Sequence, residues 1–271
     1  MRIISICPSN TELLGYLNLT KHIVAVDDYS DWPNEVHSLP RLGPDLSINM
    51  DLVEEMKPDL VLASLSVPGM EKNILELEKR KIPHVVLNPQ SLNEIAEDLV
   101  KVGELTGQTE YAKKAAHSFH QFISTYRGFA QKINQPKSVY FEWWPKPIFT
   151  PGKKNWLTEI AELAGAKNVF HHEEQASVQT DWDEVLTRNP DHICMCWVGV
   201  EEKRMKKEHV LKREQADTLH AVQEGNIHLL EEALFCRPSP RLLLGLKKLA
   251  PLLNPNVFPA HDGREPLDHF R

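Results

Sequence analysis

The sequence predicts an α/β protein with two Rossmann-like lobes joined by a single long backbone helix. Three observations carry this prediction. Strand-like and helical segments alternate over residues 1–90, residues 91–133 are helical with no strand signal, and the alternation then returns. Such alternation is typical of a parallel sheet with helices on its faces. We therefore expect an N-terminal lobe at 1–90, an interlobe helix at 91–133, a C-terminal lobe at 134–259 and a loose polar tail at 260–271.

The elements of the first lobe follow one another in a regular order. The strand-like runs read RIISICP, HIVAVDD, PDLVLAS and PHVVLN, and the helical runs between them include MDLVEEM and MEKNILELEKRK. Ser9 is expected to cap the first helix, with Glu12 placed three residues later in a capping-box arrangement. Ser91 and Glu94 repeat that arrangement at the start of the interlobe helix. Thr106 and Gly107 mark a kink in this helix, which would reach roughly 60 Å if unbroken.

The second lobe repeats the pattern of the first. Its strands are expected in SVYFEWW, HICMCW and GNIHLLEE, and its helices in NWLTEIAELAG, WDEVLTR and SPRLLLGLKKLAPLLN. Pro58-Asp59 and Pro190-Asp191 each follow a short acidic helix and precede a buried strand. This approximate duplication indicates two similar lobes.

Composition and charge exclude several classes of protein. The chain has 271 residues, of which 25% are charged, and its net charge of −7 argues against a dominant nucleic-acid role. No apolar run approaches the roughly 18 residues of a membrane span. The apolar stretch at 3–8 runs directly into a helix, so it is interpreted as the first strand and not as a secretory signal. We expect a cytoplasmic protein if Met1 is native, and an extracytoplasmic one if the chain is a trimmed mature form.

Motifs of catalysis are missing from the sequence. Dinucleotide, P-loop, zincin and nucleophile-elbow motifs are all absent. The pair His171-His172 and the basic run 203–213 are interpreted as solvated segments. The cysteines Cys7, Cys194, Cys196 and Cys236 are interpreted as reduced, buried thiols, with Cys194 and Cys196 on the same face of a strand. We predict no catalytic residue, no protein-held metal and no cofactor.

Aromatic and proline residues gather directly after predicted strands. DDYSDWP, EWWPKPIF, Trp197 and the pair Phe235 and Arg237 all occupy such positions. In open α/β sheets ligands bind beyond the carboxyl ends of the strands, and indoles there provide wide apolar area with few rotamers to freeze. We expect these rings from both lobes to converge on one cleft. The predicted ligand-binding residues are Pro8, Tyr29, Trp32, Gly43, Ser64, Trp143, Trp144, Phe149, Trp197, Phe235 and Arg237.

Several of these segments, in this order, resemble one known family. RIISICPSNTELLGYLNL, HIVAVDDYSDWP, KPDLVLAS, IFTPGKKNW, AELAGAKNVF and RPSPRLLLGLKKLAPLLNP look like the substrate-binding proteins of metal-chelate ATP-binding-cassette (ABC) importers, a class III periplasmic-binding-protein fold. The likeness covers about residues 2–255 and is strongest to the cobalamin-binding branch. Ferric siderophore and haem binders are related.

The resemblance also implies roles for individual residues. The family's turn tyrosine falls on Tyr29, its second-lobe aromatic loop on Trp143, Trp144 and Phe149, and its arginine before the last helix on Arg237. Gly43 and Ser64 stand near positions where close cobalamin binders carry tryptophans. The family docks on its permease through one acidic residue on each lobe, which would be Glu71 in the first lobe and Glu201 or, preferably, Glu202 in the second.

The resulting expectation is a monomeric, non-catalytic protein that binds cobalamin or a related corrinoid, as part of an ABC importer or as a cytoplasmic relative. The helix start at Ser9-Asn10 and Arg237 would serve anionic groups of the ligand. A ferric siderophore or haem is the same-class alternative. The different-class alternative is a chelatase-like enzyme acting on a tetrapyrrole, which would need histidines such as His84, His171, His192 and His228 to converge with carboxylates in the cleft.

Overall fold

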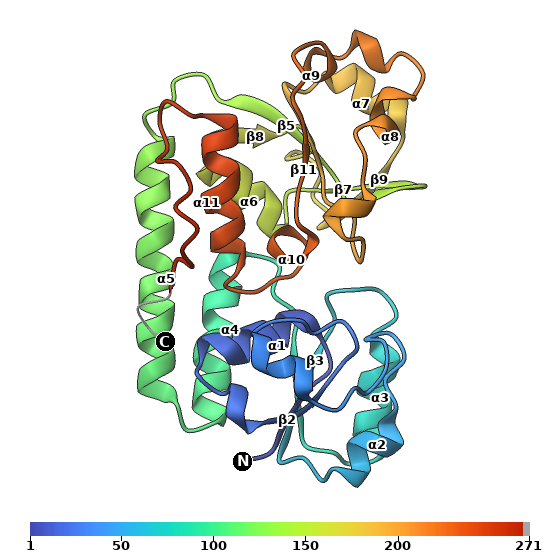
Figure 1. Cartoon of the computed structure of the whole chain (residues 1–271), viewed down its shortest axis with the longest axis vertical. Helices are drawn as coiled ribbons and strands as arrows, with labels where there is room; N and C mark the ends of the chain where they lie inside the picture. Colours follow the sequence, from blue (N-terminus) through green and yellow to red (C-terminus); the bar gives the residue numbers. More distant parts are fainter. Residues whose placement is uncertain (268–271) are drawn as a thin grey trace.

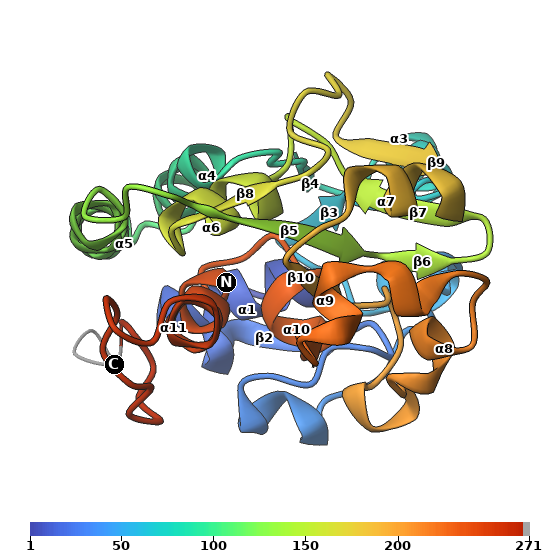
Figure 2. The ribbon, with the colours of Figure 1, turned by 90° about the horizontal axis from the view of Figure 1, so that it is seen from above.

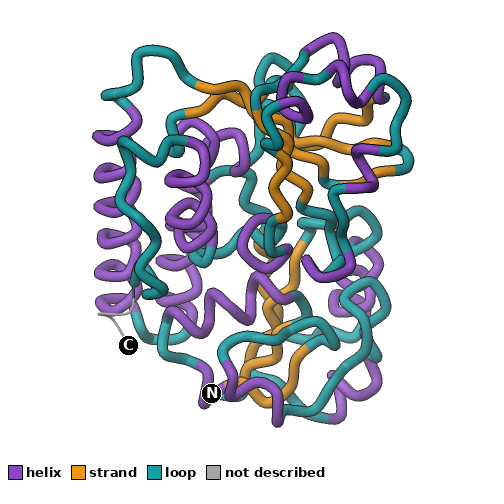
Figure 3. Tube along the Cα trace, turned by 45° about the horizontal axis from the view of Figure 1, so that its top comes forward, coloured by secondary structure: helices purple, strands orange, loops and turns teal. Residues whose placement is uncertain are grey.

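Two parallel four-stranded sheets organise the computed structural model, which describes residues 1–267 (Figure 1). The strands of the two sheets form separate groups with loops between them (Figure 3). The first sheet has the order β2-β1-β3-β4, with β1 Ile3–Ser5, β2 Ile23–Val26, β3 Leu60–Ser64 and β4 His84–Leu87. The second has the order β11-β10-β5-β8, with β5 Lys137–Glu142, β8 Ala166–Asn168, β10 His192–Met195 and β11 Ile227–Leu229. The predicted fold class is therefore confirmed.

Helices cover both faces of each sheet. The N-terminal lobe carries α1 Pro8–Tyr16, α2 Met50–Glu55 and α3 Glu71–Lys79. The C-terminal lobe carries α6 Trp156–Leu163, α7 Trp182–Arg188, α8 Glu208–Leu211, α9 His220–Gln223, α10 Glu232–Phe235 and α11 Leu242–Leu253. Short 3₁₀ turns lie at Thr20–His22, Asn34–Ser38, Glu202–Arg204 and Ala216–Thr218.

One apolar core runs through both lobes. Alternate strand residues point to opposite faces, so Ile3 and Leu62 of the first sheet and Val139 and Phe141 of the second all enter the same cluster. Cys194 of β10 and Cys196, directly after the strand, also lie in this cluster, so both point to the same side of the sheet as predicted. The outer face of each sheet packs into a separate, smaller cluster. Because the shared core fills the junction, the two lobes are joined by close packing as well as by chain connections.

The interlobe segment departs from one continuous helix. It forms α4 Leu92–Leu105 and α5 Thr109–Ala130, which lie side by side (Figures 1 and 2). Gly107 has φ +73, a left-handed conformation that ends a helix and that glycine adopts at low cost. At the residues where we predicted a kink, the chain therefore leaves the helix and reverses direction between α4 and α5. α5 is about 33 Å long at 1.5 Å per residue and is the long helix that spans both lobes.

A small antiparallel sheet occupies a segment that the sequence analysis treated as a loop. Its strands are β6 Trp144–Pro145, β7 Ile148–Pro151 and β9 Ser177–Thr180. The prolines of WPKPIFTP obscured this pattern, but Pro145 and Pro151 stand at strand ends, where a missing N–H is tolerated. The hairpin extends from β5 beyond the C-terminal sheet (Figure 2).

The two Pro-Asp sequences have equivalent contacts, as the predicted duplication implies. The Asp59 carboxylate accepts a hydrogen bond from the Arg2 N–H, just before β1, at 2.6 Å. The Asp191 carboxylate accepts one from the Ser138 N–H, in β5, at 2.7 Å. In each lobe, the aspartate before one strand therefore fixes the start of the neighbouring strand.

The loose tail predicted at 260–271 is a packed segment as far as residue 267. Asp262 pairs with Lys247 of α11 at 2.5 Å, and Glu265 accepts a hydrogen bond from the Tyr16 hydroxyl at 2.8 Å. Leu267 is buried in the shared core. The polar composition of the segment therefore reflects an ion pair with α11 and a hydrogen bond with α1. Residues 268–271 lie outside the described part of the chain.

Asp98 on α4 is a half-buried residue with one unpaired carboxylate oxygen. Its Oδ2 atom has no hydrogen-bond partner among residues 1–267, and burial raises the pKa of the carboxyl to about 6. A carboxyl with a raised folded pKa lowers stability above that pKa, and the loss disappears as the pH falls toward the unfolded value. We expect Asp98→Asn to raise the free energy of unfolding by about 1–2 kcal/mol at about pH 7.5, and by less than about 0.5 kcal/mol at about pH 4.

Urea denaturation of both proteins at the two pH values measures this difference. Glu104→Gln, an exposed change on the same helix, is the matched control and should alter stability by less than about 0.5 kcal/mol. An equal gain for Asp98→Asn at both pH values would show that the ionised carboxylate is not its cause.

Candidate ligand-binding cleft

A cavity of about 790 Å³ lies between the lobes, at the carboxyl ends of the strands of both sheets. Loops after β1, β2 and β3 form one wall, and loops after β10 and β11 form the other. The first wall consists of Cys7, Pro8, Ser9, Asp28, Tyr29, Asp31, Asp45, Leu46, Ser66 and Val67. The second consists of Val198, Gly199, Val200, Glu201, Glu202, Arg204, Glu231, Glu232, Ala233, Cys236, Arg237 and Pro238.

Negative charge dominates the lining of this cavity. Seven lining residues carry carboxylates, and two, Arg204 and Arg237, carry guanidinium groups. The apolar part of the lining comes from Pro8, Tyr29, Leu46 and Val67 of the first wall and from short side chains such as Val198 and Val200 of the second. Tyr29 is 53% exposed, so its ring is available to a ligand.

Arg237 connects the two walls at the cavity through three carboxylates. Its Nη1 atom lies 3.0 Å from Glu12 Oε1 and 2.6 Å from Asp31 Oδ1, and its Nη2 atom lies 2.9 Å from Glu232 Oε2. Glu12 is fully buried in α1 and also accepts a hydrogen bond from the Ser239 hydroxyl. Burial raises the pKa of Glu12, whereas Arg237 and Arg241 oppose that rise.

The sequence analysis missed this role of Glu12 because it read the residue as half of a capping box. In the structure Cys7 is the N-cap residue of α1, Pro8 is its first helical residue, and Ser9 lies inside the helix. The signal available in the sequence was an acidic residue within the apolar helix PSNTELLGY, together with the two arginines of RPSPR. The sequence alone does not show that Glu12 and Arg237 form an ion pair, because the two residues are 225 positions apart.

A hydrogen-bond network holds the tyrosine turn of the first wall in place. The Ser30 hydroxyl donates to Asp27 Oδ2 at 2.5 Å, and the Tyr29 N–H donates to Asp27 Oδ1 at 2.8 Å. Arg41 donates to the backbone oxygens of Asp27 and Ser30 at 2.8 and 2.6 Å. Burial raises the pKa of Asp27 to about 6. The turn that presents Tyr29 is therefore positioned before a ligand arrives.

A buried ion pair anchors the loop of the second wall. Glu142, at the end of β5, is fully buried and accepts hydrogen bonds from Arg213 Nη1 at 2.5 Å and Nη2 at 2.9 Å. It also accepts one from Trp197 Nε1 at 3.1 Å and one from the Tyr140 hydroxyl at 3.0 Å. Trp197 and Arg213 flank the segment 198–204 that lines the cavity, so Glu142 fixes both sides of that segment.

The predicted convergence of aromatic rings on the cavity is wrong for most of them. Trp32, Trp143 and Phe235 pack in or against the shared core, where Trp32 lies on Tyr16 with ring centroids 5.0 Å apart and Trp143 lies on Trp156 at 5.5 Å. Each of these rings comes after a strand but points toward the shared core, where it contacts other apolar side chains. Only Tyr29 of the predicted rings lines the cavity in the described part of the chain.

The other predicted rings lie in the C-terminal lobe, outside the cavity lining. Trp144 and Phe149 face each other across the β6–β7 hairpin, and Trp144 is 42% exposed. Trp197 is held by Glu142 and lies against His209, with ring centroids 4.9 Å apart. The indoles of this lobe thus support the loops and do not form the wall itself.

The remaining predicted residues divide between the lining and its support. Pro8 and Arg237 line the cavity. Gly43 lies behind it, where its N–H donates to Asp28 Oδ1 at 3.1 Å. Ser64 also lies behind it, and its hydroxyl bonds that of the lining residue Ser66 at 2.9 Å. Gly43 and Ser64 therefore position lining side chains.

The histidines named for a chelatase-like site do not meet in the cavity. His84, His171, His192 and His228 are all absent from its lining. His192 and His228 contact each other at 3.0 Å across β10 and β11, and burial lowers the pKa of His192 to about 4. No group of three or more histidine, cysteine or acidic side chains in residues 1–267 is placed to hold a metal ion.

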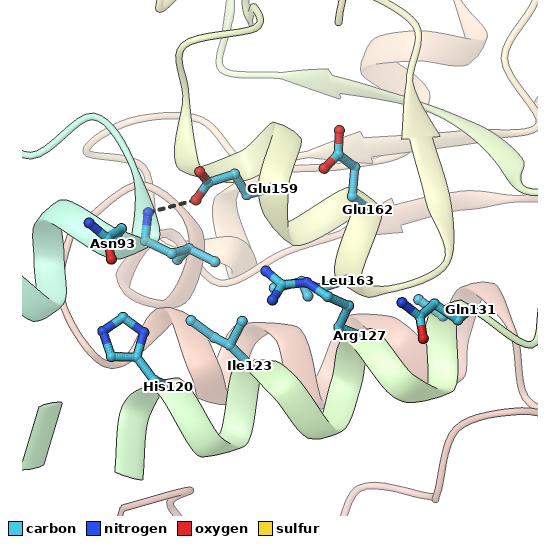
Figure 4. A pocket seen from close by; sticks show the side chains of 10 residues that line it. Asn93, His120, Ile123, Arg127, Gln131, Glu159, Glu162 and Leu163 are labelled. Atoms are coloured by element: carbon cyan, nitrogen blue, oxygen red, sulfur yellow. Dashed lines mark hydrogen bonds between the residues drawn. The ribbon is translucent and has the colours of Figure 1, made fainter. Parts of the chain in front are cut away.

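A second cavity, of about 590 Å³, lies on the helical side of the molecule between α4, α5 and α6 (Figure 4). Glu159 of α6 reaches across it and accepts a hydrogen bond from the Leu92 N–H at the start of α4, at 2.6 Å. This contact joins the interlobe helix α4 to α6 of the C-terminal lobe. Arg127 of α5 points into the same space (Figure 4).

In the described part of the chain no helix is both long and apolar enough to cross a bilayer.

Comparison with known proteins places this geometry in a family. The family model described as periplasmic binding protein matches residues 3–234. The chain belongs to the periplasmic binding protein family. A curated relative, an uncharacterised ABC transporter substrate-binding lipoprotein of Bacillus subtilis, is 30% identical over 267 residues, which are 95% of this chain and 81% of the relative.

Solved structures of the family extend the comparison. The periplasmic vitamin B12 binding protein BtuF of Vibrio cholerae is 28% identical and superposes with a TM-score of 0.78, over 93% of this chain and 96% of that one. IsdE of S. aureus, solved with haem, has a TM-score of 0.82 at 19% identity, over 93% and 98% of the two chains, which shows the fold alone.

The family determines the general role of the chain. It is a substrate-binding component of an ABC importer, and its ligand is a small molecule. Because the family consists of binding proteins, the chain is non-catalytic. Of the relatives named, one is a lipoprotein and the vitamin B12 binding protein is periplasmic, and both are extracytoplasmic.

Proposed function

We propose that this chain binds a corrinoid such as cobalamin in the cleft between its lobes and delivers it to an ABC permease and its ATPase. The observation that carries the proposal is the carboxylate lining of the cavity. A corrinoid displays amide side chains around its ring, and carboxylates accept strong hydrogen bonds from amide N–H groups. Vitamin B12-binding relatives, 28% identical over 93% of this chain, support the same ligand class.

The same lining argues against haem and against carboxylate siderophores. Both ligands carry carboxylates of their own, and like charges brought together in a partly desolvated cleft repel. A positively charged ferric hydroxamate meets no such repulsion, and it is the second candidate. Burial of the aromatic rings removes the stacking argument for a corrinoid, so the proposal depends on the polar lining, on Tyr29 and on the relatives.

Titration followed by visible absorption tests the proposal. We expect cyanocobalamin to bind with a Kd below roughly 10 µM, and haem to bind more weakly. Ferrioxamine B, a cationic ferric hydroxamate, is the third probe. Binding of ferrioxamine B without cyanocobalamin would replace the corrinoid by the second candidate, and preferential binding of haem would contradict the electrostatic argument.

Permease docking stays a prediction. Glu71 is exposed at the start of α3 in one lobe, and Glu202 is exposed in the 3₁₀ turn of the other. Glu201, the other candidate, pairs with Lys203 at 2.5 Å, which favours Glu202. We propose that these two carboxylates orient the protein on arginines of its permease, outside the membrane, where exposed ion pairs act mainly on encounter.

A further inference from the structure

The charges of the cleft are poorly balanced by the protein itself. The single positive charge of Arg237 is paired with three carboxylates, those of Glu12, Asp31 and Glu232, so it does not neutralise any further carboxylate. Glu231 pairs with Lys248 outside the lining, at 2.5 Å. Three further lining carboxylates have no ion-pair partner among residues 1–267. The only lining guanidinium group without an ion-pair partner among these residues is that of Arg204. These carboxylates are Asp28, Asp45 and Glu202.

Carboxylates of the two lobes also act on each other across the cavity. Asp45 belongs to the first wall and Glu232 to the second. The pKa of Asp45 is raised, first by partial burial and then by the negative charge of Glu232. Two negative charges on opposite walls of a cavity favour the binding of a positively charged ligand between them. The cavity between the lobes is the ligand site of the proposed function, and its carboxylates would decide which ligand charge it accepts.

We propose that the cleft selects corrinoids by charge and binds a cationic corrinoid more tightly than a neutral one of the same shape. This inference rests on the proposed function, because it takes a corrinoid to be the ligand. A corrinoid with water as an axial ligand of cobalt(III) carries one more positive charge than the same corrinoid with cyanide there. The chemical class selected is therefore aqua corrinoids, and Asp28 and Asp45 of the first wall are the residues that select it.

Two ligand pairs separate charge from shape. Aquacobalamin is monocationic and cyanocobalamin neutral; aquacyanocobinamide is monocationic and dicyanocobinamide neutral. We expect the full chain to bind the cationic member of each pair about three- to tenfold more tightly at low ionic strength. The preference should shrink at high salt, since mobile ions screen the partly exposed carboxylates. Calorimetric titration of the four corrinoids at two salt concentrations measures both effects.

Two variants test the residues. Asp28→Asn with Asp45→Asn removes two negative charges while keeping an oxygen at each site, including the acceptor for the Gly43 N–H. We expect this double variant to lose most of the preference for the cationic member. It should bind both members more weakly than the parent does, since a neutral amide oxygen accepts a weaker hydrogen bond from a corrinoid amide than a carboxylate does. Glu55→Gln, an exposed charge removal on α2 outside the cavity lining, is the matched control and should keep the preference.

The outcomes distinguish the inference from the function on which it rests. If none of the four corrinoids binds below roughly 10 µM, the proposed function is wrong and the inference falls with it. If all four bind equally at low salt, the inference alone is wrong. A preference for aqua forms that survives high salt and shifts the cobalt absorption bands would also overturn it. Such a result would show cobalt ligation by the lining thiols Cys7 or Cys236.

Discussion

Replacing Arg213 by alanine is expected to lower the free energy of unfolding by about 3–5 kcal/mol, since a buried carboxylate loses its only cationic partner in the described structure. Glu142 has no solvent exposure and depends on both guanidinium nitrogens of Arg213, at 2.5 and 2.9 Å. The hydrogen bonds from Tyr140 and Trp197 remain in the variant, but they do not neutralise the charge. Urea denaturation of the parent and the variant at neutral pH measures the loss.

Two further variants distinguish the unpaired charge from lost packing. Arg213 also lies over the Trp182 ring, 4.7 Å from its centroid, so alanine removes some packing as well. Arg213→Lys keeps the charge but not the paired hydrogen bonds, and we expect it to lose less stability than alanine. Arg213→Met combined with Glu142→Gln removes both charges and should regain at least half of the loss. A double variant as unstable as Arg213→Ala would contradict the assigned cause.

The strands and their faces follow from local patterns in the sequence. Ile3 and Ile4 enter different clusters because neighbouring strand residues point to opposite faces, and Cys194 and Met195 repeat this in the second lobe. The turn at Gly107 was marked by its glycine. A glycine alone does not distinguish a kink from a reversal, and α5 reverses because its apolar face packs on α4 and α6.

The lining of the cleft was much harder to predict. An aromatic residue after a strand can line the cleft or pack in the core, and only tertiary contacts decide which of the two it does. The Trp156 indole donates to the Phe235 carbonyl at 2.9 Å, a contact across 79 positions that holds both residues inside. The carboxylates come from separate loops of both lobes, so no stretch of sequence shows that they share a cavity. Tyr29 and Arg237 were predicted from their positions after strands and again from the family resemblance, and Pro8 lies in a segment that carries the resemblance.

The second large effect concerns Arg237, at the contact between the lobes. We expect Arg237→Met to lower the free energy of unfolding by about 3–5 kcal/mol at about pH 7.5. Methionine keeps much of the side-chain volume, so the loss reports charge. Without Arg237, the buried carboxylate of Glu12 retains only the more distant Arg241, whose Nη1 atom lies 3.4 Å from Glu12 Oε1. Asp31 and Glu232 lose their common partner at the same time.

The pH dependence of this loss has a definite sign. Burial already raises the pKa of Glu12 in the parent, and Arg237 is the strongest opposing influence. Removing Arg237 raises that pKa further, so ionised Glu12 lowers the stability of the variant above its folded pKa, and protonation removes the penalty as the pH falls. The difference in unfolding free energy between parent and variant should therefore shrink between about pH 7.5 and about pH 5. Urea denaturation across this range measures it.

Neutralising Glu12 in the same protein tests the assignment. Arg237→Met with Glu12→Gln should be more stable than Arg237→Met alone at about pH 7.5, because the glutamine leaves no buried charge and still accepts the Ser239 hydrogen bond. A loss that stayed constant with pH, or that Glu12→Gln did not relieve, would mean that Arg237 stabilises the lobes through packing. If charge is the cause, the arginine that resemblance assigned to the ligand also holds the two walls of the cleft together, and a ligand enters between walls that this ion-pair cluster has already set.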